Sequence, residues 1–243
     1  MTAVAPPTHE FILETVSARY GRPAFVFFFG SHAFGRGHAG SDVDVIVVLR
    51  QISHGFRETF SSGGFLFDAQ VHDPETLHCM MRSEYANGFA VYAKKIDEAL
   101  ALPEPTELSS KLKDVARQIL ASAPPKRWDM LRHHMSAILS DLERCADLDE
   151  SQFLAMHLYA MSLDMFLRSR GQFCQQGAYL VRSVKDLDAA FFGRAQAAVE
   201  RLFQERSPRP LMEVARECLD SVGGTLEAGY RENYPATFRL ALP

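Results

Sequence analysis

Two aspartates interrupt a run of residues that otherwise has the composition of a buried β-strand. Asp42 and Asp44 precede four consecutive apolar residues in the run Asp-Val-Asp-Val-Ile-Val-Val, residues 42–48. Side chains two residues apart in a strand point to the same side, so both carboxylates would share one face. Carboxylates that close together repel each other strongly unless a cation neutralises them. The chain must therefore fold so that this strand meets a cation.

The first half of the chain has the pattern of a small sheet with helices around it. Short apolar runs bounded by glycine and proline predict buried strands, and a weaker run predicts an edge strand. The strands are expected at residues 24–29, 43–49, 65–72 and, at the edge, 89–93. The helices are expected at residues 8–20 and 73–82, where Asp73 and Pro74 form a helix start.

The second half of the chain has a different period. After the proline-containing segment 102–106, apolar residues recur with the spacing of amphipathic helices. The helices are expected at residues 108–121, 128–146, 151–170, 186–206 and 210–222. The sequence thus predicts an α+β protein, with a mixed-sheet catalytic domain at residues 1–103 and an all-α helical bundle at residues 104–243.

A glycine and a serine precede the two aspartates and could form a phosphate site beside them. Gly30 follows the strand expected at residues 24–29 and permits close approach of backbone to a ligand. Ser31 would open a short helix, whose free N–H groups and hydroxyl favour phosphate oxygens. Asp68 lies in the apolar run 65–72. If its strand pairs with that of Asp42 and Asp44, three carboxylates converge and can hold two Mg²⁺ or Mn²⁺ ions about 3.5–4 Å apart.

These motifs resemble those of the nucleotidyltransferase superfamily of DNA polymerase beta. That pattern is a Gly-Ser pair, a spacer near ten residues, Asp-x-Asp and a later acid on a neighbouring strand, matched here by Gly30, Ser31, Asp42, Asp44 and Asp68. The resemblance is strongest to the type of kanamycin nucleotidyltransferase and the minimal nucleotidyltransferases, which pair such a domain with a C-terminal helical bundle.

The resemblance implies a Mg²⁺-dependent transfer of a nucleoside monophosphate to a hydroxyl group. Asp42, Asp44 and Asp68 would bind two metal ions and act in catalysis, while Gly30 and Ser31 hold the phosphates of ATP or another NTP. We also assign Arg36 and Ser41 to nucleotide binding, because a guanidinium suits phosphate. A general base from the helical half is implied as well. The candidates for it are Asp141, Glu143 and Asp164.

The acceptor stays open at this stage. A small hydroxyl compound such as an aminoglycoside-like antibiotic is the leading hypothesis, with AMP from ATP as the transferred group. The alternatives are an antitoxin-type enzyme that AMPylates a protein and a non-catalytic nucleotide-binding module. A helical ribonuclease, based on Arg127 and His133, is a further alternative.

Composition limits the classes of partner that the protein can bind. A net charge of −4 argues against an extended nucleic-acid face, although a nucleotide needs only a small positive field. No apolar run is long enough to cross a membrane, and the N-terminus does not have the pattern of a signal peptide. We expect a cytoplasmic protein, whose four separated cysteines stay reduced and whose oligomeric state, a homodimer included, is open.

Overall fold

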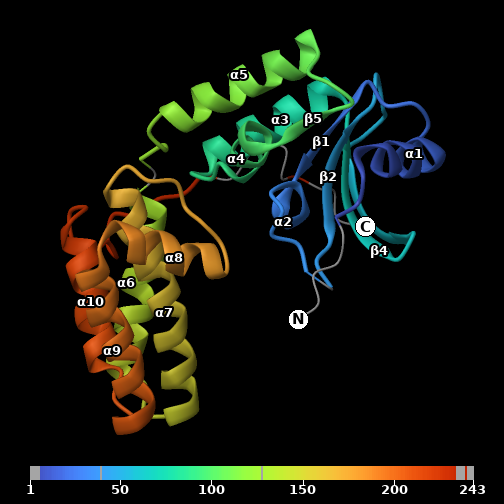
Figure 1. The fold of residues 1–243 in the computed structure, drawn as a ribbon. Helices are drawn as coiled ribbons and strands as arrows, with labels where there is room; N and C mark the ends of the chain where they lie inside the picture. The colour runs from blue at the N-terminus through green and yellow to red at the C-terminus, as the bar shows by residue number, and fades with distance from the viewer. Residues whose placement is uncertain (1–5, 39, 127, 234–238, 240–243) are drawn as a thin grey trace. The chain divides into compact units, whose positions relative to one another are not determined.

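The computed structural model describes residues 6–38, 40–126, 128–233 and 239. It divides into two compact units, Met1–Ala123 and Pro124–Pro243. The division falls later than the boundary expected after residue 103, because a further helix remains with the first unit. This helix is α5 (Glu107–Ala121), and Figure 1 draws it beside α4 (Val91–Glu98). Lys113 of α5 donates hydrogen bonds to the carbonyls of Asp97 and Ala99, which tie the two helices together.

The first unit is built on a five-stranded mixed sheet with strand order β3-β4-β2-β1-β5. Its strands are β1 (Phe25–Phe29), β2 (Val43–Val48), β3 (Phe56–Ser62), β4 (Phe65–His72) and β5 (Leu100–Leu102). The pair β2 and β4 is parallel, and the other neighbours are antiparallel. The predicted α+β class with a mixed sheet is therefore confirmed.

Helices cover both faces of this sheet (Figure 1). Those of the first unit besides α4 and α5 are α1 (His9–Tyr20), α2 (Gly30–Ala33) and α3 (Pro74–Ala86). On one face, Ile12 and Val16 of α1 pack on Val26, Phe28 and neighbouring strand residues. Such contacts remove apolar side chains from water, which stabilises the fold by roughly 25 cal/mol per Å² of apolar surface buried. On the other face, α3 contacts β4 and α4 contacts β1.

Three elements of the first unit differ from the expectation, and one of them is the short strand β5, which was not expected. The edge strand expected at residues 89–93 is wrong, because Val91 begins α4, in which Ala93 and Ile96 are buried at helical spacing. The strand β3 was not expected. It forms a hairpin with β4, and Gly63 and Gly64 between the strands both have positive φ.

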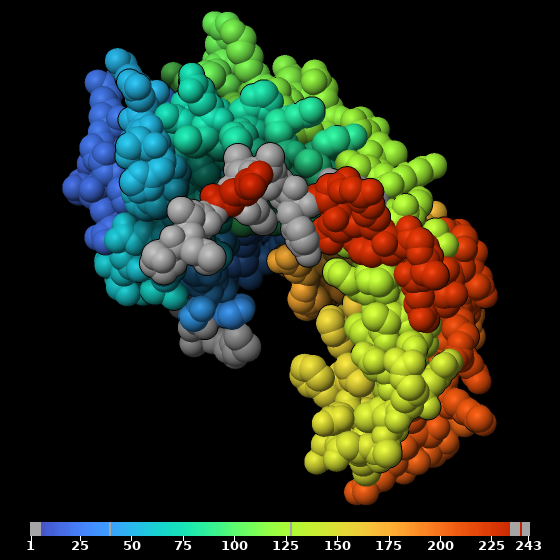
Figure 2. Space-filling model, turned by 180° about the vertical axis from the view of Figure 1, so that it is seen from behind, coloured from blue at the N-terminus to red at the C-terminus, as the bar shows by residue number. Residues whose placement is uncertain are grey.

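The second unit consists of helices. They are α6 (Trp128–Arg144), α7 (Leu148–Ser169), α8 (Ala178–Leu187), α9 (Ala189–Glu205) and α10 (Arg209–Asp220). The helix expected at 186–206 begins later, because the Asp188 side chain accepts a hydrogen bond from the Phe191 N–H and caps α9. The helix α8 before it was not expected. In Figure 2, α6 and α10 lie side by side, and Glu143 pairs with Arg216 between them.

The described residues contain no helix with the length and apolar character that a membrane crossing requires.

Candidate functional site

Three carboxylates meet where β2 and β4 run side by side. Asp44 of β2 is the register partner of Asp68 of β4, and Asp42 lies just ahead of β2. One carboxylate oxygen from each of the three lies within 4.8 Å of the others. The parallel pairing of β2 with β4 produces this cluster, because its register places Asp44 beside Asp68 on the same face of the sheet.

The cluster has the electrostatics of a cation site. Burial, followed by the charges of Asp42 and Asp68, raises the pKa of the Asp44 carboxyl to about 6. Lys95 and Arg57 act in the opposite direction on the same carboxyl. A set of hard carboxylate oxygens that repel one another is the donor set that Mg²⁺ or Mn²⁺ neutralises. The residues present therefore fit a divalent cation.

Arg57 of β3 pairs with the third acid. Its Nε and Nη2 atoms each donate a hydrogen bond of 2.7 Å to a different oxygen of Asp68. The Asp68 side chain is 6% exposed, whereas that of Arg57 is 67% exposed. This bidentate pair is the geometry in which guanidinium binds carboxylate most specifically.

Lys95 of α4 is the second cation at the cluster. Burial lowers its pKa, while the charges of Asp44 and Asp68 act to raise it. Its Nζ lies 5.1 Å from the ring centre of Phe29 and 5.5 Å from that of Tyr92. Sequence reasoning missed both Arg57 and Lys95. The Gly63-Gly64 pair after Arg57 was a hairpin signal that would have located β3.

Gly30 lies directly against the acid cluster. Its φ of +78° is unfavourable for residues with a side chain, and a Cβ atom there would lie 2.0 Å from Oδ2 of Asp44. Next to it, Ser31 is half-buried at the beginning of α2, and its carbonyl accepts a hydrogen bond from the Arg36 N–H. The glycine of the Gly-Ser pair is thus explained by its contact with Asp44.

The loop before Asp42 is held by its own polar groups. Buried His32 donates from Nε2 to the Ser41 carbonyl, and the Ser41 hydroxyl accepts from the His38 N–H. Gly37 packs on the His32 ring, where a Cβ would lie 2.3 Å from Nδ1. The exposed Arg36 guanidinium lies 5.6 Å from the ring centre of Phe34. Ser41 therefore has a visible part in positioning Asp42, and a role of Arg36 or Ser41 toward a nucleotide stays a prediction.

Gln70 and His72 follow Asp68 on the same face of β4 and are both buried. His72 Nε2 lies 3.4 Å from the Tyr92 hydroxyl. The contact of His72 with Tyr92 of α4 and the contact of α3 with β4 show that helices cover these side chains.

The general-base candidates lie in the second unit, each in an ion pair. Asp141 pairs with Arg144 at 3.2 Å, Glu143 with Arg216 at 2.7 Å and Asp164 with Arg168 at 2.6 Å. Their catalytic role stays a prediction.

The ribonuclease alternative gains no support from the described residues. Arg127 lies outside them. His133 donates from Nδ1 to the Leu226 carbonyl at 3.2 Å and stacks on Tyr230, so it is engaged in holding the segment after α10.

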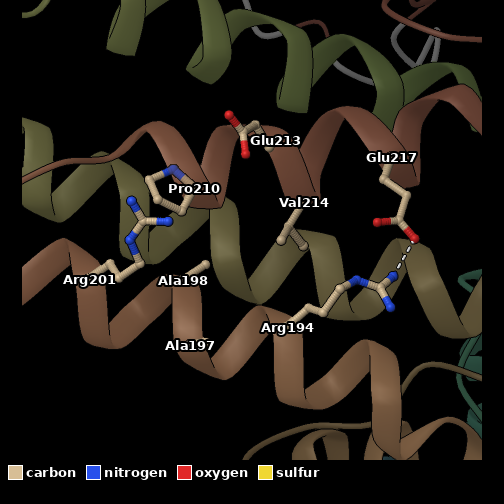
Figure 3. Close-up of a pocket in the computed structure, with 8 residues that line it drawn as sticks. All are labelled: Arg194, Ala197, Ala198, Arg201, Pro210, Glu213, Val214 and Glu217. Atoms are coloured by element: carbon tan, nitrogen blue, oxygen red, sulfur yellow. Dashed lines mark hydrogen bonds and ion pairs between the residues drawn. The ribbon is translucent and has the colours of Figure 1, made fainter.

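A groove in the second unit is lined by none of the predicted site residues. It runs between α9 and α10, and Figure 3 shows small side chains along it with charged ones at its rim. Arg194 and Glu217 form an ion pair of 2.7 Å at that rim. The groove has none of the acids or glycines described above.

Comparison with protein families matches the segment that contains these acids. The family model of the nucleotidyltransferase domain matches residues 10–72, which contain Gly30, Ser31 and all three aspartates. Among solved structures, a nucleotidyltransferase-like protein from Exiguobacterium sibiricum is similar over 88% of this chain and 75% of that chain, with a TM-score of 0.46 and 12% sequence identity. No curated protein matches the sequence.

Proposed function

The chain carries a domain of the nucleotidyltransferase superfamily at residues 10–72, and we propose that it transfers a nucleoside monophosphate from an NTP to a hydroxyl group. One observation carries this proposal. Asp42, Asp44 and Asp68 present oxygens within 4.8 Å of one another, inside the segment that matches the family. Three converging carboxylates beside a glycine turn are what a metal–triphosphate complex requires.

The residues would divide the work as follows. Asp42, Asp44 and Asp68 would hold Mg²⁺, and Mg²⁺ supplies charge neutralisation for the triphosphate and activation of the acceptor hydroxyl. Gly30 has no side chain to collide with the Asp44 carboxylate, which lies against it, and its positive φ lets the backbone turn beside the proposed phosphate site. The Ser31 hydroxyl and the Arg36 guanidinium would donate hydrogen bonds to phosphate oxygens. Ser41 would contribute to nucleotide binding from the loop before Asp42, which its hydrogen bonds to His32 and His38 hold in place.

The reaction is an in-line displacement at the α-phosphorus. The acceptor oxygen forms the new bond, and the bond to the bridging oxygen breaks, so that pyrophosphate leaves with the electron pair. The hydroxyl proton passes to a base, for which Asp68 is one candidate and the acids of the second unit are others. Lys95, held near Asp44 and Asp68, adds positive potential where negative charge accumulates.

For substrates we propose ATP and a small hydroxyl compound, with aminoglycoside-like antibiotics as the first class to test. Support for the acceptor comes only from the resemblance to the kanamycin type. The protein's net charge of −4 is compatible with a cationic acceptor.

The test is transfer of label from an α-labelled NTP. The purified protein is incubated with Mg²⁺, each of the four NTPs and either a panel of aminoglycosides or a cell extract, and labelled products are separated by size. Label on a small molecule supports the proposed acceptor, and label on a protein shifts it to AMPylation. Absence of any transfer with every acceptor argues against the activity.

The variant Asp42→Asn serves as the first test of the site. It removes a metal ligand with little change in volume, so we expect turnover to fall by about 10³-fold or more while the protein stays folded. Asp114→Asn is the matched control, because Asp114 lies in the same unit and forms an exposed ion pair with Arg117. Near-normal turnover of Asp42→Asn would refute the metal assignment.

A further inference from the structure

The bidentate pair of Arg57 with Asp68 occupies the carboxylate that a metal ion would need. Both oxygens of Asp68 accept hydrogen bonds from the guanidinium at 2.7 Å. A divalent cation bound to either oxygen would lie close to the positively charged guanidinium, and like charges that share one carboxylate repel each other. The guanidinium and a metal ion therefore compete for the same carboxylate.

We propose that Arg57 is a placeholder cation, which neutralises Asp68 while the metal is absent and is displaced from Asp68 when a metal binds there. This inference rests on the proposed function. It makes metal binding at Asp68 a competition between an ion and an arginine of the protein itself.

The position of Arg57 allows its side chain to move away from Asp68. β3 is the edge strand of the sheet, and the Arg57 side chain is 67% exposed. The guanidinium can thus rotate into solvent without unpacking any core residue. Lys95 differs in this respect, because it is half-buried on α4 with its Nζ over the rings of Phe29 and Tyr92. Of these two cations, Arg57 is the one that can move freely.

A triphosphate gives the released guanidinium a new partner. Phosphate oxygens accept bidentate hydrogen bonds from arginine as carboxylates do. A nucleotide would therefore draw Arg57 away from Asp68 and make metal binding there easier. Metal and nucleotide would be coupled through one side chain, and such coupling acts equally in both directions.

The test measures Mn²⁺ affinity by equilibrium dialysis and electron paramagnetic resonance, without turnover. We expect Arg57→Ala to bind Mn²⁺ about tenfold more tightly than the wild type, which corresponds to about 1.4 kcal/mol. Arg57→Lys keeps the charge but loses the bidentate geometry, and we expect it to bind about threefold more tightly. Tighter Mn²⁺ binding by Arg57→Lys than by Arg57→Ala would overturn the placeholder, because the lysine keeps the competing charge and the alanine does not.

Nucleotide coupling gives a second readout. With a non-hydrolysable ATP analogue, Mn²⁺ binding should tighten in both proteins, but by about tenfold less in Arg57→Ala, because its site has no arginine to displace. Equal tightening in the two proteins would overturn the coupling.

Two controls separate this proposal from the proposed function. Arg19→Ala removes the arginine paired with Glu58, the residue next to Arg57 on β3, and should leave Mn²⁺ affinity unchanged. The double variant Asp42→Asn with Asp44→Asn should lose Mn²⁺ binding. If the wild type binds no better than this double variant, the metal site and the proposed function fail together. If the wild type does bind through these acids, while Arg57→Ala binds equally or more weakly, only the placeholder fails.

Discussion

At the scale of single residues, Gly30 is fixed by its distance from a carboxylate. A Cβ atom there would lie 2.0 Å from Asp44 Oδ2, and the backbone has a φ of +78°. We expect Gly30→Ala to destabilise the protein by about 2–4 kcal/mol and to reduce turnover at least tenfold, because either Asp44 or the turn must move. Urea unfolding and the transfer assay measure the two effects.

Gly35 supplies the control for this variant. Its φ is +67°, yet nothing lies within 4 Å of the position that a Cβ would take. Gly35→Ala should therefore show the backbone cost alone, about 1 kcal/mol. Equal losses of stability in the two variants would mean that contact with Asp44 has no part in fixing Gly30.

We predict that the ionised Asp44 carboxylate lowers the free energy of unfolding of the metal-free protein at neutral pH. Its pKa is about 6 in the folded chain against a usual 3.8, so the folded state keeps the proton over a pH range where the unfolded state has lost it. The free energy of unfolding must then fall as pH rises from about 4 to about 6 and stay low above that range. At pH 7.5 without metal, Asp44→Asn should be more stable than the wild type by about 2 kcal/mol.

The measurement is urea unfolding in the presence of a chelator from pH 4 to pH 7.5. Near pH 4 the two proteins should differ little, and Asp114→Asn should follow the wild type throughout. Mg²⁺ should raise the stability of the wild type at pH 7.5 more than that of Asp44→Asn. A wild type that is equally or more stable than Asp44→Asn at pH 7.5 would contradict the electrostatic picture of the cluster.

At the scale of secondary structure, the sequence predicted the elements whose own pattern was unambiguous. The runs around 24–29, 43–49 and 65–72 are apolar and short, with clear boundaries, and each is a strand in the structure. The edge strand β3 is polar at every position except Phe56 and Phe60 and lacks the alternation of a half-buried strand, so its identity depends on pairing with β4. Pairing is a tertiary property, and for this reason β3 was not expected.

The same distinction applies to the site. The acids could be predicted, because their position in or beside apolar runs is visible in the sequence. The two cations could not be assigned in the same way. Arg57 reaches Asp68 from a strand that was not expected, and Lys95 from a helix whose beginning had been assigned to a strand. The sequence alone therefore did not predict the two cations of the cluster, Arg57 and Lys95, because tertiary packing brings them to the acids.

At the scale of the whole molecule, the boundary between the units decides which piece can fold alone. Leu112, Ala116 and Ile119 of α5 are buried, and Lys113 bonds to the end of α4. A chain ending at residue 103 would expose the helix surface that α5 covers. We expect residues 1–123 to unfold cooperatively in urea, and residues 1–103 to be at least about 3 kcal/mol less stable or to aggregate.

Metal binding extends this test to the site. The three acids, Arg57 and Lys95 all belong to the first unit. Residues 1–123 should therefore bind Mn²⁺ with nearly the affinity of the full chain, and Arg57→Ala should tighten binding in the fragment as it does in the full chain. Transfer to an acceptor should be lost if the base comes from the second unit and retained in part if Asp68 takes the proton. A fragment 1–103 that folds and binds Mn²⁺ as well as 1–123 would show that α5 is dispensable and return the boundary to residue 103.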